Sequence, residues 1–286
     1  MGRPRPPPPA ERVRARLRAA AGARVAAAMP AGYQRLGHVL VLRLPPTLRP
    51  YHALLGAAWQ DELGVATVLV RAGPIDGELR RPVVERIAGG PTETEVVEHG
   101  IRWRFDAAEI MFAAGNRTER RRAGGLVDPG ETVVDLFAGI GYFAIPAAVH
   151  GARRVLAVDK NPVAVRYLLE NARRNRVAER VVALAGDNRA VELPRGAADR
   201  VFLGYLPSAV PWVGRAVELV RPGGWLHVHL VVDAHHARAR AEHEVAAALA
   251  AAGGSPGAPP RARRVKPYGP GRTHVVVDAK VGPGAG

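Results

Sequence analysis

The 286-residue chain contains no cysteine, and this absence excludes several kinds of protein at once. Disulfide frameworks, thiolate zinc sites, iron–sulfur clusters and cysteine nucleophiles all need the missing residue. No apolar run approaches the roughly 20 residues of a membrane-spanning helix. The basic N-terminus also lacks the apolar core of a secretory signal. We therefore expect a soluble, cytoplasmic protein with no membrane partner.

Lysine is scarce, because only Lys160, Lys266 and Lys280 occur, and arginine supplies the rest of the basic side chains. The formal net charge is nevertheless +15. Such an excess favours a polyanionic partner, since a basic surface binds the phosphates of nucleic acids. A GC-rich codon bias would raise arginine and alanine throughout the chain, and composition alone leaves both explanations open.

The composition and the pattern of apolar residues divide the chain into three parts. Residues 1–28 are rich in proline, arginine and alanine, which predicts a flexible basic tail. Residues 29–105 contain strand patterns over 38–44 and 66–71, a helical pattern over 51–63 and a hairpin pattern over 94–106. These patterns predict a small α+β domain.

Residues 106–286 have the sequence pattern of a larger α/β domain. Short apolar strands alternate there with helices, which is typical of a parallel sheet covered on both faces. Residues 263–281 read Arg-Arg-Val-Lys-Pro-Tyr-Gly-Pro-Gly-Arg-Thr-His-Val-Val-Val-Asp-Ala-Lys-Val. This segment predicts two strands joined by a Gly-Pro turn, which would give the sheet an antiparallel edge.

Three polar motifs follow three successive strands of the predicted sheet. Gly139 and Gly141 lie in the sequence Asp-Leu-Phe-Ala-Gly-Ile-Gly-Tyr-Phe, Asp159 ends the next strand, and Asp187 with Asn188 follows the third. Glycines allow a close backbone approach to a ligand, and a strand-end carboxylate suits ribose hydroxyls. An N-cap for the helix near residue 162 is a second role open to Asp159. The carboxyl ends of parallel strands meet at one crevice, so we expect a nucleotide-like cofactor there.

Two cofactor classes fit such a crevice. A dinucleotide site favours Gly-x-Gly-x-x-Gly, and Ala144 at the third glycine position is tolerated, so the glycines do not decide. The Gly-Asp-Asn-Arg motif at 186–189 and the terminal hairpin favour the Rossmann-like class I fold that binds S-adenosyl-L-methionine.

From about residue 33 to 281 the chain resembles the tRNA guanosine-37 modification family. That family contains N1-guanine methyltransferases and wybutosine-synthesising aminocarboxypropyltransferases. The similar stretches lie at residues 77–80, 102–120, 135–143, 159–165, 186–189 and 265–278.

The segment after the fourth strand indicates the branch. The methyltransferases have an Asn-Pro-Pro or similar element there, whereas residues 202–208 read Phe-Leu-Gly-Tyr-Leu-Pro-Ser, similar to the aminocarboxypropyltransferases. Gly204 and Tyr205 replace the asparagine, and we expect the glycine to open room beside the cofactor sulfur. The resemblance thus implies transfer of the 3-amino-3-carboxypropyl group to C7 of 4-demethylwyosine at position 37 of tRNA(Phe).

The resemblance also implies roles for particular residues. It places Asp159 on the cofactor ribose, Asp187 and Asn188 on the adenine, and Arg120 at the cofactor. Ala113 stands where the family often has serine, so a contact there would have to come from its backbone. The tRNA anticodon stem-loop is the implied partner, and we expect a monomer. No catalytic base is identified.

Several alternatives stay open. A guanosine-37 methyltransferase, or a cofactor-binding RNA-recognition protein with little turnover, would share the same motifs. His227, His229, His235 and His236 invite a metal site, but their spacing favours structural or substrate contacts, so we expect no metal.

Other motifs have two interpretations each. The run 120–122 of arginines is typical of a solvated helix face. Trp212 fits packing better than base stacking, and Ser208 fits an N-cap or a substrate-facing loop equally well.

Overall fold

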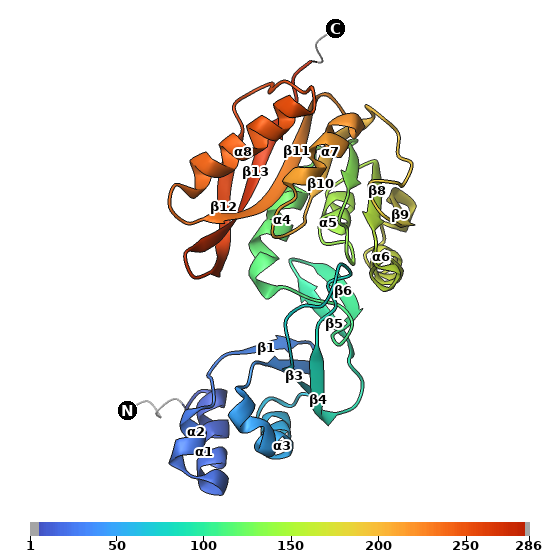
Figure 1. The fold of residues 1–286 in the computed structure, drawn as a ribbon. Helices are drawn as coiled ribbons and strands as arrows, with labels where there is room; N and C mark the ends of the chain where they lie inside the picture. The colour runs from blue at the N-terminus through green and yellow to red at the C-terminus, as the bar shows by residue number, and fades with distance from the viewer. Residues whose placement is uncertain (1–5, 284–286) are drawn as a thin grey trace, which may run out of the picture. The chain divides into compact units, whose positions relative to one another are not determined.

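The chain folds into two compact units in the computed structural model, which describes residues 6–283 (Figure 1). The smaller unit comprises residues 1–97 and 103–112, and the larger unit comprises residues 98–102 and 113–286. The border expected between residues 105 and 106 is therefore placed differently, because a hairpin is shared between the two units. Within the described residues, no helix has both the length and the apolar content needed to cross a membrane.

The expectation of a flexible tail over residues 1–28 is wrong for its described helical part. Helix α1 spans Pro9–Ala21 and helix α2 spans Ala23–Ala27. Ala10, Val13 and Leu17 recur at helical spacing and are buried in the core of the smaller unit, where α1 packs against helix α3 (His52–Leu63). Arg12 forms an ion pair with Glu62 of α3. Residues 1–5 of the expected tail lie outside the described part.

The smaller unit is built on a four-stranded sheet. Its spatial order is β1 (Tyr33–Leu36), β2 (Val39–Leu42), β3 (Thr67–Arg71) and β4 (Val84–Gly89). Strands β2 and β3 are parallel, and the other two pairs are antiparallel. A short 3-10 helix, η1 (Pro46–Tyr51), precedes α3. The strands and the helix predicted between residues 38 and 71 are confirmed.

The predicted hairpin is also confirmed. Strands β5 (Glu93–Glu98) and β6 (Ile101–Asp106) are joined by His99 and Gly100. Both turn residues have positive φ, at 51° and 80°. Two such residues match the right-handed twist of a tight hairpin.

The larger unit contains a seven-stranded sheet that confirms the predicted α/β class. The sheet order is β12-β13-β11-β10-β7-β8-β9. Strands β7 to β11 run parallel, while β13 is antiparallel to both β11 and β12. The strands are β7 (Thr132–Asp135), β8 (Arg154–Asp159), β9 (Val181–Ala185), β10 (Ala198–Leu203), β11 (Val220–Asp233), β12 (Arg261–Gly269) and β13 (Arg272–Lys280).

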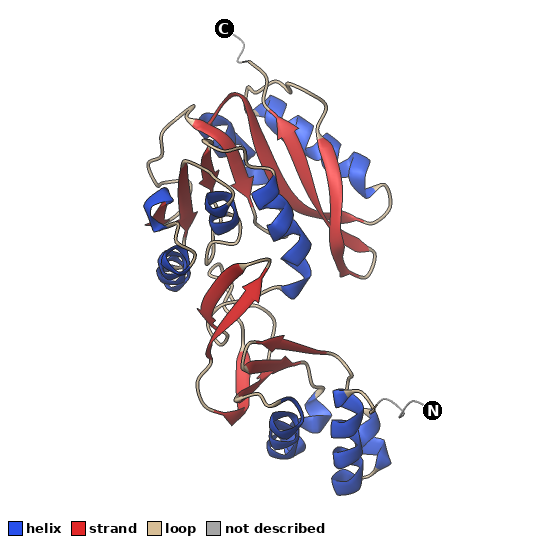
Figure 2. Ribbon diagram, turned by 180° about the vertical axis from the view of Figure 1, so that it is seen from behind, coloured by secondary structure: helices blue, strands red, loops and turns tan. Residues whose placement is uncertain are grey.

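Helices cover both faces of this sheet (Figures 1 and 2). Helices α7 and α8 pack on one face over a core of Val, Leu and Ala side chains, and α4, α5 and α6 lie on the other. The strand order reverses between β7 and β10, so the chain leaves these strands in opposite directions and forms a crevice at their carboxyl ends. The helices are α4 (Arg117–Gly125), α5 (Ala144–Val149), α6 (Pro162–Arg174), α7 (Val213–Leu219) and α8 (Ala237–Ala251), with short 3-10 turns η2 (Ala114–Asn116), η3 (Ala178–Arg180) and η4 (Val210–Trp212).

The packing of α1 generates a stability prediction. Leu17→Ala removes a fully buried side chain from the core of the smaller unit. We expect it to lower the free energy of unfolding by about 2–4 kcal/mol, the usual range for a buried leucine. Urea denaturation measures the change. Arg18→Ala, one residue away and exposed, is the control. Equal small effects of both substitutions would contradict the packing.

Candidate functional site

A tight glycine turn connects β7 to α5. Gly139 and Gly141 have φ angles of +54° and +103°, which residues other than glycine rarely adopt. A Cβ on Gly139 would lie 2.9 Å from the ring of Tyr142. The backbone N–H of Gly139 donates a 2.6 Å hydrogen bond to Oδ2 of Asp159. The turn is thus held against the end of β8.

Asp159 is oriented by backbone donors on both sides. Its Oδ1 accepts a 2.8 Å hydrogen bond from the N–H of Asn161. The carboxyl is largely buried, and burial raises the pKa of Asp159 while these backbone bonds oppose the shift. The N-cap of α6 is Asn161, which accepts from the N–H groups of Val163 and Ala164. Asp159 is therefore not the cap, and its carboxylate keeps lone pairs for a ligand.

Asp187 and Asn188 follow β9 at the same edge of the sheet. The Asn188 amide is buried and donates a 2.6 Å hydrogen bond to the carbonyl of Leu136, just after β7. Asp187 pairs with Arg189 at 2.6 Å and Lys160 at 3.6 Å. The hydrogen bonds from Arg189 hold the pKa of Asp187 well below its usual value. The loops after β7, β8 and β9 are thereby joined, as the sequence predicts; the adenine contact itself stays a prediction.

Asp135 is a further strand-end carboxylate that was not singled out from the sequence. It ends β7, is fully buried, and accepts a 3.2 Å hydrogen bond from the N–H of Phe137. Burial, together with the nearby charge of Asp159, raises the pKa of Asp135 to about 7. Its position inside the glycine motif was the available signal. A carboxylate on an otherwise apolar strand has no reason to be there for packing alone.

Arg120 is not on a solvated helix face, contrary to expectation. It is only 4% exposed, and it forms a 2.5 Å ion pair with Glu98. It also donates a 3.0 Å hydrogen bond to the carbonyl of Ala113, and its guanidinium carbon lies 5.6 Å from the ring centroid of Tyr142. The structure thus brings Ala113 and Arg120 together beside the glycine turn. The engaged group of Ala113 is its backbone.

Arg122 is partly buried and has different partners. It bridges Glu119 at 2.7 Å and Asp278 of β13 at 2.8 Å. Asp278 also pairs with His227 at 2.6 Å, and although burial raises its pKa, the bonds from His227 and Arg122 hold the pKa of Asp278 at about 2. Arg200 donates to Nε2 of His227, so the ring proton sits on Nδ1. This network fixes α4 to the sheet.

Aromatic side chains gather at the carboxyl ends of β7 and β10. The ring centroids of Phe137, Tyr205 and Trp212 lie 5.0–5.2 Å apart in each pair. Trp212 therefore packs, as expected. The room expected beside Gly204 is already filled, because a Cβ there would lie 2.6 Å from the ring of Phe143. Glycine at 204 accommodates Phe143 and opens no empty space.

Ser208 and His229 have defined contacts in the structure. Ser208 is not the N-cap of α7; its hydroxyl accepts a 3.3 Å hydrogen bond from the N–H of Val210 in the turn before η4. His229 and His274 form a buried 2.9 Å pair within the sheet. Among residues 6–283, no group of three or more His, Asp or Glu side chains is arranged to hold a metal ion.

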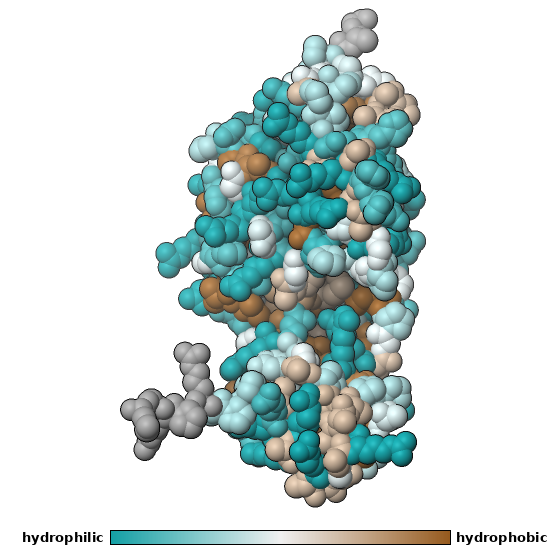
Figure 3. Space-filling model, turned by 90° about the vertical axis from the view of Figure 1, so that its left-hand side faces the viewer, coloured by the Kyte–Doolittle hydropathy of each residue, from teal (hydrophilic) through white to brown (hydrophobic). Residues whose placement is uncertain are grey.

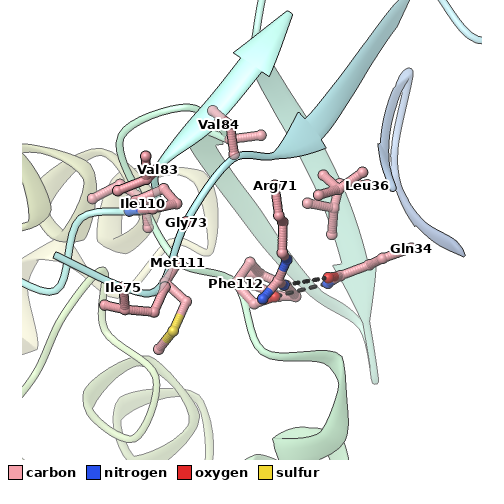
Figure 4. Close-up of a pocket in the computed structure, with 13 residues that line it drawn as sticks. Gln34, Leu36, Arg71, Gly73, Ile75, Val83, Val84, Ile110, Met111 and Phe112 are labelled. Atoms are coloured by element: carbon pink, nitrogen blue, oxygen red, sulfur yellow. Dashed lines mark hydrogen bonds between the residues drawn. The ribbon is translucent and has the colours of Figure 1, made fainter. Parts of the chain in front are cut away.

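A pocket in the smaller unit was not foreseen from the sequence (Figure 4). Gln34 crosses it, donating a 2.7 Å hydrogen bond to the carbonyl of Phe112 and accepting a 3.5 Å bond from Arg71. Burial and the nearby charge of Arg43 lower the pKa of Arg71. Its walls are mainly apolar and come from segments far apart in the sequence, which explains why no local motif marks it. The lining residues are Gln34, Leu36, Val41, Arg71, Gly73, Ile75, Pro82, Val83, Val84, Ala107, Ile110, Met111 and Phe112.

The parallel sheet with its antiparallel terminal hairpin, the glycine turn and the strand-end carboxylate define a class I S-adenosylmethionine-dependent transferase fold. Comparison with known families identifies the family within this fold class. Residues 94–250 match the TRM5/TYW2 methyltransferase domain, and residues 13–92 match the TYW2 N-terminal domain. The chain belongs to the TRM5/TYW2 family.

Individual relatives agree with this assignment. The chain is 36% identical over 254 residues to the tRNA(Phe) (4-demethylwyosine(37)-C(7)) aminocarboxypropyltransferase of Pyrococcus horikoshii, covering 88% of this chain and 90% of the relative. The crystal structure of P. horikoshii TYW2 in complex with MeSAdo has a TM-score of 0.82 and 31% identity, over 95% of this chain and 98% of that one. M. jannaschii TYW2 in complex with AdoMet has a TM-score of 0.72 and 31% identity, over 88% and 100% of the two chains.

The raised pKa of Asp135 generates a pH prediction. A folded-state pKa near 7 means that the folded protein holds the proton more tightly than the unfolded chain, whose value is near 3.8. The stability contribution is therefore fully present below about pH 4 and lost as the pH rises to about 7. Asp135→Asn removes this dependence while keeping the shape and the acceptor for Phe137.

We expect the variant's advantage in unfolding free energy to grow from near zero at pH 4 to about 3–4 kcal/mol above pH 7. Urea denaturation at several pH values measures the difference between the two proteins. A difference in unfolding free energy that is constant across this pH range would contradict the raised pKa of Asp135.

Proposed function

We propose that the chain transfers the 3-amino-3-carboxypropyl group of S-adenosyl-L-methionine to C7 of 4-demethylwyosine at position 37 of tRNA(Phe), a step of wybutosine-type tRNA modification. The observation that carries this proposal is the 36% sequence identity to the P. horikoshii aminocarboxypropyltransferase, which extends along most of both chains. The match of residues 13–92 to the TYW2 N-terminal domain favours the same branch of the family.

The residues present fit S-adenosylmethionine. Each oxygen of Asp159 accepts from one backbone N–H, which leaves lone pairs that could accept from ribose hydroxyls. The glycines at 139 and 141 give the turn its positive φ angles, and Asp187 lies at the adjacent strand end. Ala113 and Arg120 would meet the methionine arm. When bound, S-adenosylmethionine supplies the 3-amino-3-carboxypropyl group and leaves as 5′-methylthioadenosine.

The protein's contribution to this transfer is orientation. Transfer requires the acceptor carbon to lie about 3–3.5 Å from the γ-carbon, opposite the sulfur. The new C7–carbon bond forms as the carbon–sulfur bond breaks, and the proton on C7 is then lost. Phe143, seated against Gly204, closes one wall of the crevice, while the half-buried rings of Phe137 and Tyr205 offer flat surfaces for a tricyclic base.

The tRNA substrate is supported by the charge of the chain. The net charge is +15, and hydrophilic residues dominate the face of the larger unit seen in Figure 3. A basic surface binds RNA phosphates with release of counterions. The anticodon stem-loop as the part of tRNA that is contacted, the cytoplasm as the compartment and a monomer as the active state stay predictions of the sequence.

The ribose role of Asp159 is directly testable. Asp159→Ala should weaken binding of S-adenosylmethionine by about 1.5–3 kcal/mol, the scale of losing hydrogen bonds to a charged group. Isothermal titration calorimetry measures the affinity. Asp128→Ala, which removes an exposed carboxylate from the same unit, should leave it unchanged. Unchanged affinity of the Asp159 variant would take this carboxylate out of the site.

The transferred carbon is identified by the nucleoside that is left. We expect turnover with tRNA to release 5′-methylthioadenosine, and label in the carboxyl carbon of the cofactor, not in its methyl, to reach the RNA. Chromatography of the by-product and counting of both labels measure this. S-adenosylhomocysteine as the sole by-product would replace the proposal with a guanosine-37 methyltransferase. Bound cofactor with no label in RNA would favour an RNA-recognition protein.

A further inference from the structure

Lys266 of β12 is a half-buried lysine that the functions described above do not use. It approaches η2 so closely that a Cβ on Gly115 would lie 2.8 Å from its Cδ and 3.1 Å from its Nζ. Its amine has no hydrogen bond or ion pair to any residue between 6 and 283. The absence of a side chain at position 115 therefore lets a positive charge reach the backbone just after Ala113.

The surroundings of this amine are positively charged. Burial, and then the charge of Arg120, lowers the pKa of Lys266. Burial, and then the charge of Lys266, lowers the pKa of His274 to about 4. Glu98 pairs with Arg120 at 2.5 Å, whereas the Lys266 amine has no carboxylate partner among residues 6–283. One positive charge in a partly desolvated place is left without compensation, which is unfavourable unless an anion binds there.

Arg120 lies beside the glycine turn. The guanidinium of Arg120 is 5.6 Å from the centre of the Tyr142 ring. That ring would be 2.9 Å from a Cβ on Gly139, whose N–H donates to Asp159. A short series of contacts thus connects the carboxylate expected to hold the ribose to Arg120. Arg120 donates to the carbonyl of Ala113, two residues before the glycine that Lys266 approaches.

We propose that Lys266 and Arg120 together bind the carboxylate of the 3-amino-3-carboxypropyl arm of S-adenosylmethionine. This rests on the proposed function. A carboxylate between the two cations would replace their mutual repulsion by two attractions, and a lysine amine is a compact donor for it. With the adenosine held at Asp159 and the carboxylate held at Lys266, the arm is fixed at both ends. The γ-carbon between them then has a defined position.

Calorimetry with two ligands tests the proposal without RNA. 5′-Methylthioadenosine shares the adenosine and the sulfur but lacks the carboxylate. Lys266→Met should lower the affinity for S-adenosylmethionine about tenfold, the scale of one charge-assisted hydrogen bond reduced by partial exposure. It should leave the affinity for 5′-methylthioadenosine within about twofold, which also shows that the variant is folded.

Lys280→Met is the matched control. Lys280 is a half-buried lysine on the partner strand of the same hairpin, with its amine 5.8 Å from the Trp225 ring. It should change neither affinity. Gly115→Ala provides an independent test, because the added methyl displaces the Lys266 amine without removing its charge. We expect the same selective loss of S-adenosylmethionine.

Three outcomes would overturn the proposal: unchanged affinity for S-adenosylmethionine, equal loss for both ligands, or a loss of tRNA affinity alone. The last would assign Lys266 to an RNA phosphate. Failure of the proposed function is distinguishable, because it appears as S-adenosylhomocysteine released by the wild-type enzyme, whereas this measurement concerns binding of the cofactor in the absence of RNA.

Discussion

The hydrogen bond from the backbone N–H of Gly139 to Asp159 is the constraint on which the rest of the site depends. It joins the ends of two adjacent parallel strands and requires a residue that tolerates positive φ at the turn. Because the carboxylate also accepts from Asn161, the start of α6 is fixed by the same side chain. Asn188, bonded to the carbonyl of Leu136, adds the third strand end. One edge of the sheet is therefore ordered before any ligand arrives.

The face of the sheet under α4 is built differently from the face under α7 and α8. The latter is an apolar core, whereas the former holds the buried His227 and the partly buried Arg122 and Asp278 in one bonded network. Burying charges is costly unless each is paired, and pairing requires a defined geometry. The network consequently fixes the rotation of α4, and with it the direction in which Arg120 faces.

Much of the fold was predictable because its signals are local. Alternating strands, glycine turns and strand-end carboxylates lie within a few residues of one another, and parallel topology then brings them to one crevice. The misses depend on distant partners. The apolar spacing of Ala10, Val13 and Leu17 is diluted by arginines, and it makes a helix only with α3 beneath it. The burial of Arg120 needs Glu98, which lies on another element.

The same limit applies to the site. Position 204 could be compared with the family, but Phe143, which fills the space there, lies just before α5, about 60 residues earlier in the chain. Sequence spacing indicates which residues share a strand end. It does not indicate which side chain occupies the volume between two strand ends, because that depends on packing between segments that are far apart in the chain.

The division of the chain has a consequence for how the protein can be dissected. The polypeptide passes from one unit to the other three times, at residues 97–98, 102–103 and 112–113. No single cut separates the units. A fragment that begins at residue 113 would lose Glu98 and leave the buried guanidinium of Arg120 without its counter-charge. Neither unit is therefore one continuous stretch of the chain, because each contains a short segment that lies between two segments of the other.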